Sequence, residues 1–466
     1  MPGLCAVPAR KVAVRKVRAC GSESGVWVRV RDRVRTTVLV GAVAAGLALG
    51  APGAAFGAGP APGPLPEYRV PEGARPVQGK PSSADAPLLE PGTVYEDTVS
   101  PGERFYRLGL DDTSDVYVSA VVRPTKGSEV GYSDGVEVEI MTKEGRRCPN
   151  PGRAGFAYDP VPIGAAAVRR VREDADCRAG GIYYAKVTRT AAKDSARGPW
   201  PVELLVRREP GLGGAVPTVA PSVWPSASPT LPGAEPVART GGTGFNDARA
   251  LGGGVWRDDL RPGQTRYYRV PLDWGQQLGI GAEIAAAEMT KPYGSAPGGL
   301  TVSLYSPYRG LVDSEDTSYD GKQAAVTLPK TAPVAYENRF SNDAAVRGTG
   351  VAGWYYLAVT LGGKVADFTR DVTPVPLTLR MDVVGAPGKA PAYRESLGAA
   401  GFGVGSADRT AAKEGLTGPE AAAAEDDRSV MRVVAGAGFG AGLVLLLGLG
   451  GWFLLARAGR DLRNTP

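Results

Sequence analysis

One short segment of the chain has the spacing of a catalytic motif. Residues 131–135 (GYSDG) match Gly-x-Ser-x-Gly, in which an α/β-hydrolase holds its nucleophilic serine on a strand-to-helix turn. That serine needs a histidine to take its proton, and the sequence contains no histidine. The same absence excludes Cys-His catalysis and the common histidine-ligated zinc sites. We therefore expect Ser133-Asp134-Gly135 to form a hairpin turn, and we identify no catalytic residue.

Carboxylates form the second group that could do chemistry. Asp313, Glu315, Asp316 and Asp320 make an oxygen-rich segment of the kind that binds calcium. Their spacing differs from that of an EF-hand loop, so solvated turn residues are the alternative interpretation. Paired carboxylates could also serve a glycosidase, but the sequence singles out no pair. No cofactor is predicted, and calcium is the one metal with a candidate site.

Cysteine and tyrosine supply the remaining candidates. Cys148 and Cys177 lie close together in the exported part of the chain, and such a pair predicts a disulfide. Residues 183–184 and 355–356 are two Tyr-Tyr pairs on predicted strands, where adjacent side chains point to opposite faces. One ring of each pair should pack in the core. The other, Tyr184 or Tyr356, is a candidate for a sugar-stacking surface, with cross-strand packing as the alternative.

The elements that position these residues occur twice. Residues 95–111 (YEDTVSPGERFYRLGLD) are repeated at 256–273 (WRDDLRPGQTRYYRVPLD), with Asp97 matching Asp258. Further downstream, GIYYAKV at 181–187 matches GWYYLAV at 353–359. Blocks that recur in one order indicate an internal duplication. Each block is rich in Tyr, Val and Leu and is bounded by Pro-Gly or Gly, which is typical of strands and turns.

The predicted fold is mainly β, with two tandem antiparallel β-sandwich or jelly-roll modules and a C-terminal transmembrane helix. Seven strands are predicted in each module: near 94–98, 104–110, 115–122, 136–142, 165–171, 181–188 and 201–207, and near 254–258, 266–270, 277–286, 300–305, 323–328, 353–361 and 375–384. The predicted organisation is a leader with a signal peptide (1–57), a Pro/Gly-rich lead-in (58–87), module 1 (88–209), a Pro/Ser/Thr/Ala linker (210–250), module 2 (251–385), an Ala/Gly-rich stalk (386–432), a transmembrane helix (433–456) and a basic cytoplasmic tail (457–466).

The charge distribution bears on the partners. The chain has a formal charge of +6, but residues 1–57 hold nine Lys or Arg and two acidic residues and so carry 9 − 2 = +7. Residues 58–427 hold 40 basic and 45 acidic residues, or −5. A nucleic-acid-binding protein needs a basic folded part, so that function is excluded.

The two ends of the chain predict export and anchoring. An uncharged run at 38–49 follows Arg33 and Arg35 and precedes small residues, as in a secretory signal peptide. Residues 433–456 carry no charge and are long enough to cross a bilayer, with Arg457, Arg460 and Arg463 after them. These patterns predict a single-pass type I protein of the cell membrane, with its modules outside and its C-terminus in the cytoplasm.

The module pattern resembles a known family. Each copy has an Asp-x-x-x-Pro-Gly opening, an aromatic second strand, a Gly-x-Tyr-Tyr-x-x-Val strand and a closing Pro-x-apolar-x-Leu strand. These features resemble the bacterial pre-peptidase C-terminal domain, over about 250 of 466 residues. The arrangement also looks like that of membrane-anchored surface proteins of actinobacteria. The resemblance implies small β-sandwiches that are attached to secreted enzymes and surface proteins and are usually non-catalytic.

We therefore expect a non-enzymatic binding or scaffolding protein on the cell surface, with its two sandwiches free to move on flexible linkers. The expected partners are the membrane and either an envelope protein or a cell-wall glycan. The alternative is an accessory subunit of a secreted hydrolase or of an envelope polysaccharide-processing complex.

Overall fold

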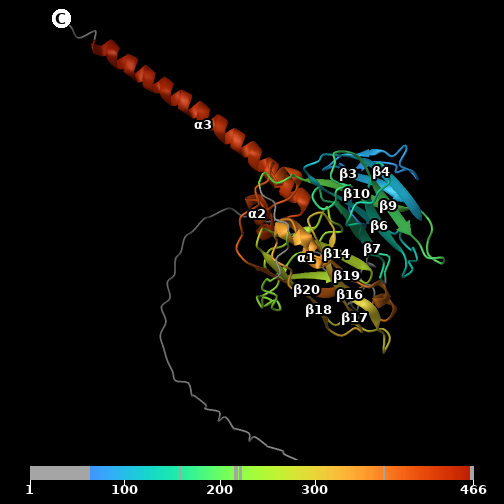
Figure 1. The fold of residues 1–466 in the computed structure, drawn as a ribbon. Helices are drawn as coiled ribbons and strands as arrows, with labels where there is room; N and C mark the ends of the chain where they lie inside the picture. The colour runs from blue at the N-terminus through green and yellow to red at the C-terminus, as the bar shows by residue number, and fades with distance from the viewer. Residues whose placement is uncertain (1–62, 158, 215–218, 220–222, 371–372, 462–466) are drawn as a thin grey trace, which may run out of the picture. The chain divides into compact units, whose positions relative to one another are not determined.

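The structure is a computed structural model, and it describes residues 63–157, 159–214, 219, 223–370 and 373–461 (Figure 1). The predicted leader and signal peptide (1–57) and the end of the predicted tail (462–466) lie outside the described residues. The described part is mainly β, with four five-stranded sheets and few helices, which confirms the mainly β part of the predicted fold class but not its C-terminal transmembrane helix. Two of the sheets come from each half of the chain, so each half is a β-sandwich.

The first sandwich consists of β1 (Arg75–Pro76), β2 (Leu88–Leu89), β3 (Val94–Val99), β4 (Gly102–Leu110), β5 (Asp115–Val122), β6 (Gly135–Thr142), β7 (Gly152–Gly155), β8 (Ile163–Arg169), β9 (Gly181–Thr190) and β10 (Trp200–Glu209). One of its sheets has the order β1-β3-β10-β5-β8, and the other has the order β2-β4-β9-β6-β7. The core between the sheets is aliphatic and aromatic, and alternate residues of each strand contribute to it.

The second sandwich consists of β11 (Val237–Ala238), β12 (Arg249–Ala250), β13 (Gly254–Leu260), β14 (Gln264–Leu272), β15 (Gln277–Ile284), β16 (Ala296–Tyr305), β17 (Leu311–Tyr319), β18 (Ala324–Leu328), β19 (Gly353–Leu361) and β20 (Val375–Val384). Its sheets have the orders β11-β13-β20-β15-β18 and β12-β14-β19-β16-β17. Every strand takes the place of the first-half strand numbered ten lower. The sequence repeat is therefore a repeat of structure.

Each predicted strand overlaps an observed strand, but three strands in each half are missed. These are the two short strands at the start of each half and the acidic or glycine-rich edge strands β7 and β17. The sandwiches are also not purely antiparallel. Strands β1 and β2 pair in parallel with β3 and β4, and the second sandwich repeats this arrangement.

A buried contact in the first sandwich explains why one sequence block recurs. The Tyr106 hydroxyl of β4 donates to Asp97 Oδ2 of β3 (2.8 Å), and the same oxygen accepts the backbone N–H of Gly79 (2.7 Å). These donors offset the cost of burying the carboxylate. A Cβ at Gly79 would lie 2.6 Å from Tyr106 Cζ, so only glycine leaves room for the ring.

The second sandwich repeats this contact atom for atom. The Tyr268 hydroxyl donates to Asp258 Oδ2 (2.6 Å), which also accepts the backbone N–H of Gly241 (2.8 Å). The repeated aspartate and tyrosine thus serve the fold, because they join the first two long strands to the segment that precedes them.

Helices are few: η1 (Tyr336–Phe340), α1 (Ala344–Gly348), η2 (Gly363–Asp367), η3 (Gly398–Ala400), α2 (Ser406–Glu414) and α3 (Gly418–Asp461). Helix α3 contains the predicted membrane span (433–456), although the side chains of residues 432–441 and 453–461 lie outside the described residues. Among the described residues, no helix combines the length and apolarity that a bilayer crossing requires.

Described parts of the segments predicted to be flexible spacers pack against the sandwiches instead. Pro229 and Leu231 of the predicted linker lie against β15. A Cβ added at Gly279 or Gly281 of that strand would lie 2.4 Å from Pro229 or Leu231, respectively. These glycines therefore leave the space that the proline-rich segment occupies. Phe402, in the predicted stalk, is only 2% exposed. The prediction that these segments are flexible linkers is wrong for these described parts, which pack against the sandwiches.

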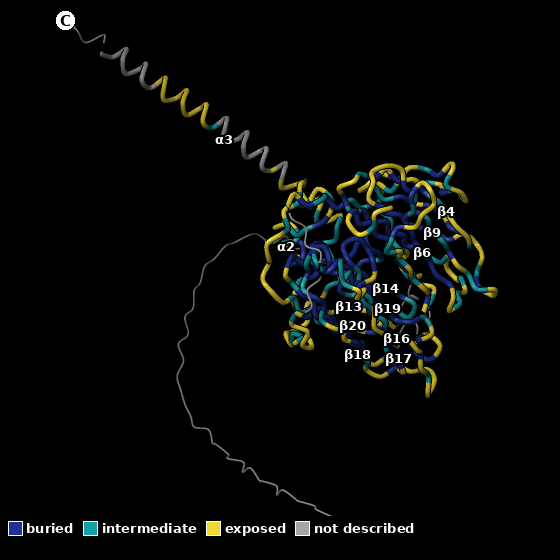
Figure 2. The backbone as a smooth tube through the Cα atoms, in the orientation of Figure 1, coloured by how far each residue is buried: buried dark blue, intermediate teal, exposed yellow. Residues whose placement is uncertain are grey.

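Figure 2 shows buried residues, in dark blue, in both sandwiches. In each sandwich, one sheet is buried on its outer face as well as on its core face. In the first sandwich this is the face of β5 and β10 that points away from the core. Val121 of β5 packs in one apolar cluster with Tyr267 and Tyr356 of the second sandwich. Tyr117 of β5 stacks on Tyr308, with ring centroids 4.2 Å apart. Both sandwiches belong to one compact unit, so the predicted independence of the sandwiches is wrong.

Candidate functional site between the two sandwiches

The contact between the sandwiches is built on two glutamates of one strand. Glu203 and Glu209 lie on β10, and both are only 1% exposed. Because they are six residues apart, they point to the same face of the sheet, opposite to the core residues of that strand. This face meets the second sandwich, so both carboxylates are buried against it and each needs a charged or polar partner.

Arg339 of η1 is the partner of Glu209. Its Nη2 donates to Glu209 Oε1 (2.9 Å), and its Nη1 donates to Asp115 Oδ2 (2.8 Å) at the start of β5. Nη2 and Nε also donate to the backbone carbonyls of Gly350 and Tyr336, both at 2.8 Å. The guanidinium lies 3.4 Å from the centroid of the Tyr336 ring. One arginine of the second sandwich therefore neutralises and binds two acids of the first.

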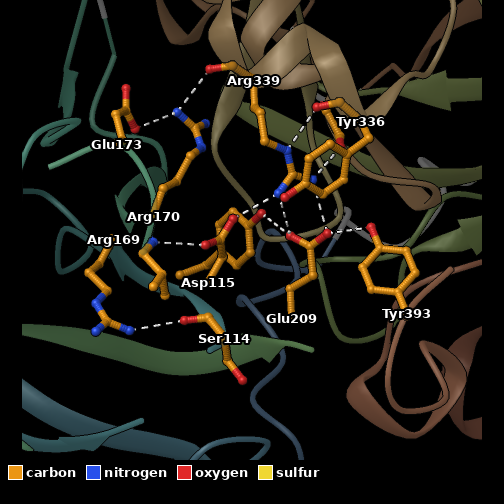
Figure 3. Close-up of polar contacts among 12 residues, drawn as sticks. Ser114, Asp115, Arg169, Arg170, Glu173, Glu209, Tyr336, Arg339 and Tyr393 are labelled. Atoms are coloured by element: carbon orange, nitrogen blue, oxygen red, sulfur yellow. Dashed lines mark hydrogen bonds and ion pairs between the residues drawn. The ribbon is translucent and has the colours of Figure 1, made fainter. Parts of the chain in front are cut away.

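Two tyrosine hydroxyls complete the surroundings of Glu209 (Figure 3). Tyr393, from the predicted stalk, donates to Oε1 (2.6 Å), and Tyr117 donates to Oε2 (2.5 Å). We call the group of Asp115, Tyr117, Glu209, Arg339 and Tyr393 the inter-sandwich network. It joins three parts of the chain that are far apart in sequence.

Further hydrogen bonds from the residues after β8 hold this network in place (Figure 3). Arg170 Nη1 donates to the backbone carbonyl of Arg339 (3.1 Å) and pairs with Glu173 (3.1 Å). Asp115 Oδ1 accepts the backbone N–H of Val171 (3.0 Å). The residues after β8 thereby fix both the acid and the arginine.

A second buried ion pair lies farther along β10. Arg309 donates to Glu203 through Nη1 and to Asn246 Oδ1 through Nη2 (2.8 Å), while Asn246 Nδ2 donates back to Glu203 (2.7 Å). The guanidinium lies 5.2 Å from the centroid of the Phe245 ring. Both ion pairs thus join a glutamate of the first sandwich to an arginine of the second.

The electrostatics of the network favour fixed charges over proton transfer. Burial raises the pKa of the Asp115 carboxyl, Arg339 opposes that shift and Glu209 adds to it, so the pKa lies above its usual value. Burial is the largest single effect and would favour neutral Arg339, but Glu209 and the other neighbouring acid and tyrosines together outweigh it, so the pKa of Arg339 lies well above its usual value. The arginine therefore stays charged, and its two acids stay bound to it.

A cavity of about 170 Å³ adjoins the network. Arg170, Arg172, Arg339 and Arg394 contribute to its wall together with Asp112, Asp115 and Glu173. Ligand sites in proteins usually enclose about 300–1,000 Å³, so this space suits a few water molecules better than a substrate. The network can hold the two sandwiches together, and this adjoining cavity is small for a substrate.

The predicted disulfide is confirmed. Cys148 and Cys177 are bonded, with their Cα atoms 5.8 Å apart, and both are buried in the first sandwich. The bond ties the segment after β6 to the loop between β8 and β9.

Ser133 of the GYSDG motif lies exposed in the loop between β5 and β6. Those strands belong to different sheets, so the expected hairpin turn is a crossing between sheets.

The structure does not assemble the calcium candidates. Asp313, Glu315 and Asp316 lie within β17 and not in a loop, so Asp316 points to the face opposite the other two. Asp320 follows that strand and binds Lys322 (3.2 Å). Among the described residues, no group of three or more acidic or cysteine side chains is placed to hold a metal ion.

The two tyrosine candidates differ in their surroundings. Tyr183 and Tyr355 are the core members of their pairs, as expected. Tyr184 is partly exposed on β9. Tyr356 is only 7% exposed, because the segment around Phe245 and the first sandwich cover its face of the sheet. Tyr356 is therefore part of the contact between the sandwiches and not of an exposed aromatic surface.

Sequence reasoning missed the inter-sandwich network, although one signal was present. Strand β5 reads DVYVSAVV, without the polar alternation of a strand that has one face in water. That pattern predicts burial on both faces, and hence a partner for the outer face. No comparable signal singles out Arg339, which lies in a short polar segment and finds its partners only in the folded chain.

Comparison with known protein families and curated proteins gives no match. Among solved structures, the pre-peptidase C-terminal domain of collagenase from Bacillus anthracis is 14% identical, covers 30% of this chain and all of its own, and has a TM-score of 0.17. The N-terminal CBM22-1-CBM22-2 tandem domain of Xyn10C from Paenibacillus barcinonensis is 15% identical, covers 63% of this chain and 92% of its own, and has a TM-score of 0.18. At these scores the similarities carry no argument about activity or ligand, and the β-sandwich assignment rests on the sheets themselves.

Proposed function

We propose that the chain is a non-catalytic binding or scaffolding protein of the bacterial envelope, in which two β-sandwiches act as one rigid platform. The observation that carries this proposal is the pair of buried contacts Arg339–Glu209 and Arg309–Glu203. Ion pairs at this depth require close geometry and lose several kcal/mol when one partner is removed. They suit a fixed arrangement of two modules, which a binding surface or scaffold needs.

The same contacts argue against chemistry at this site. A general acid or base must exchange protons with a substrate and must therefore have an oxygen free to reach it. Both carboxylate oxygens of Glu209 are engaged, by Arg339, Tyr117 and Tyr393. The sequence also lacks histidine, the side chain that most often performs this role near neutral pH.

The location is part of the proposal and rests on sequence patterns. The leader at 1–57 predicts export, and the uncharged run at 433–456 with its trailing arginines predicts an anchor. Fractionation of cells that express the full chain tests this part. We expect the chain in the membrane fraction, with the sandwiches open to added protease on intact protoplasts. Recovery in the soluble fraction, or protection from the protease, would contradict the proposed location.

Co-purification tests the platform. The full chain is solubilised with detergent from its native envelope, and we expect it to retain an envelope protein or glycan in constant ratio. Arg339→Met should lower that ratio because it loosens the platform, whereas Arg370→Met, at the exposed pair with Glu288, should not. Hydrolysis of a glycan or peptide by the purified chain, abolished by Glu209→Gln, would contradict the proposed non-catalytic function.

A further inference from the structure

The cavity beside the inter-sandwich network lies where several parts of the chain meet. Its wall includes residues 170–173 after β8, residues 210–212 after β10, η1 of the second sandwich and Arg394 of the predicted stalk. Figure 3 shows Arg170 and Arg339 at this junction. A molecule in the cavity would therefore contact both sandwiches and the segment that follows them.

Two arginines in this wall have no partner. Arg172 and Arg394 are exposed, and among the described residues neither guanidinium group takes part in a hydrogen bond or an ion pair. The neighbouring Arg208, by contrast, binds both Asp111 (3.3 Å) and Glu395 (2.7 Å). Arginine keeps its charge in proteins, so two unpaired guanidinium groups at one small cavity repel each other unless an anion lies between them.

A buried arginine in the same wall has an unused hydrogen-bond donor. Arg170 is only 6% exposed. Its Nη1 donates to Glu173 and to the backbone carbonyl of Arg339, both at 3.1 Å, but its buried Nε has no acceptor in the described part of the chain. A buried N–H group without an acceptor destabilises a folded protein. An oxygen atom in the adjoining cavity could provide that acceptor.

The acids in the wall are already engaged, with one exception. Arg339 and a backbone N–H group hold the two oxygens of Asp115, and Arg170 holds Glu173. Asp112 is the one acid of the wall whose side chain has no partner among the described residues. The unengaged side chains are therefore two cations and one anion, so the charge that remains free at the cavity is positive.

We propose that this cavity binds one small oxyanion, phosphate or the carboxylate of a small acid, between Arg172 and Arg394. The planar fork of a guanidinium group matches two oxygens of a phosphate or carboxylate with parallel N–H donors. A cavity of about 170 Å³ has room for such an ion but is too small for an oligosaccharide, a nucleotide or a peptide. The bound ion would add a link between the sandwiches beside the two buried ion pairs. This inference goes beyond the proposed function and does not rest on the identity of any partner.

Titration of the full, detergent-solubilised chain with inorganic phosphate, followed by phosphorus nuclear magnetic resonance, tests the site. At constant ionic strength we expect saturable broadening of the phosphate signal that fits one site per chain. Arg172→Gln and Arg394→Gln should each weaken binding about tenfold, because each removes charge-assisted hydrogen bonds. Arg197→Gln is the matched control. It removes the same charge from an exposed arginine that precedes β10, at the end of the strand opposite the cavity.

Two competing ions define what the site accepts. Displacement of phosphate by acetate at similar concentrations would assign the site to carboxylates as well as phosphate, and failure of acetate to displace it would assign the site to phosphate. Displacement by chloride at those concentrations would overturn the proposal, because it would show that phosphate only screens the arginines.

The stability of the chain provides a second measurement. An ion that binds only the folded chain must stabilise it, so saturating phosphate should raise the urea midpoint of the native chain more than that of the double variant with Arg172→Gln and Arg394→Gln. Absence of saturable binding, native affinity in the double variant, or equal shifts of the two midpoints would each overturn the oxyanion site. If phosphate fails to bind while the chain still retains an envelope partner, the oxyanion site is wrong and the proposed function stands.

Discussion

Replacing Arg339 with methionine tests whether the buried ion pairs hold the two sandwiches together. The arginine side chain is 3% exposed and Glu209 is 1% exposed, so the substitution leaves a carboxylate buried without its counter-ion. Removing one member of such a pair costs about 3–5 kcal/mol. The variant also loses donors to the carbonyls of Tyr336 and Gly350 and the stacking of the guanidinium on the Tyr336 ring. Methionine keeps much of the side-chain volume, which limits any cavity term.

Urea denaturation of the full chain, followed by tryptophan fluorescence and far-ultraviolet circular dichroism, measures this loss. In the native chain, the two sandwiches should unfold in one transition, because the network couples them. In Arg339→Met, we expect a lower midpoint and a separation into two transitions, because each sandwich keeps its own core. Adding Glu209→Gln should recover part of the loss, since the remaining buried charge is then removed.

The matched control is Arg370→Met. Arg370 pairs with Glu288 at 2.7 Å, but the two side chains are 53% and 59% exposed. Exposed pairs of this kind contribute at most about 1 kcal/mol. If Arg339→Met lost no more stability than this control, or kept one transition at an unchanged midpoint, the network would not couple the sandwiches and the rigid platform would be refuted.

Three further predictions concern the cores. Cys148→Ser opens a loop of 29 residues and should lower the free energy of unfolding by about 3–4 kcal/mol, as measured in urea without reductant. Tyr355→Ala and Tyr356→Ala should each cost about 3–5 kcal/mol, since both rings are buried; a negligible loss at Tyr356 would contradict its place in the contact between the sandwiches. The free energy of unfolding should fall as the pH rises above about 10. Burial, and after it the adjoining aspartate, raises the pKa of Tyr106 and Tyr268 above the value in the unfolded chain. The stabilisation that these protonated tyrosines supply is therefore complete below that pH and is lost as the pH rises above it. Urea midpoints measured from pH 8 to 12 should decline, and Tyr268→Phe should decline less steeply than the native chain.

The sequence located the long strands because their pattern is local. Runs of Val, Tyr and Leu between Pro-Gly or Gly turns predict strands such as β9 and β19, and both were found at their predicted places. Edge strand β17 escaped detection because LVDSEDTSY is acidic and polar, and a strand at the edge of a sheet needs little apolar surface. The short parallel strands at the start of each half gave no signal at all, since two residues cannot display a period.

The predicted linker and stalk show why amino-acid composition alone gave a wrong prediction of flexible segments. A segment rich in Pro and Ser cannot form a core of its own, but residues 225–232 need none, because β15 offers them a surface that two glycines leave open. The partner of such a segment lies about 50 residues away in the chain, and no local pattern reveals it. The same holds for Tyr393, whose hydroxyl reaches Glu209 across a sequence separation of 184 residues.

The two ion pairs also explain how the sandwiches keep one fixed arrangement. Glu203 and Glu209 are six residues apart on one extended strand, so their arginine contacts are separated by about 20 Å. One contact would leave the second sandwich free to rotate about it, whereas two separated contacts fix both position and rotation. Buried charges specify such an arrangement more strictly than apolar residues do, because a shifted register would leave each charge without a partner. Loosening the inter-sandwich network with Arg339→Met should therefore lower the amount of envelope protein or glycan that co-purifies with the chain, although both cores stay intact. A variant that retained its partner in the native ratio would show that recognition does not depend on the rigid platform.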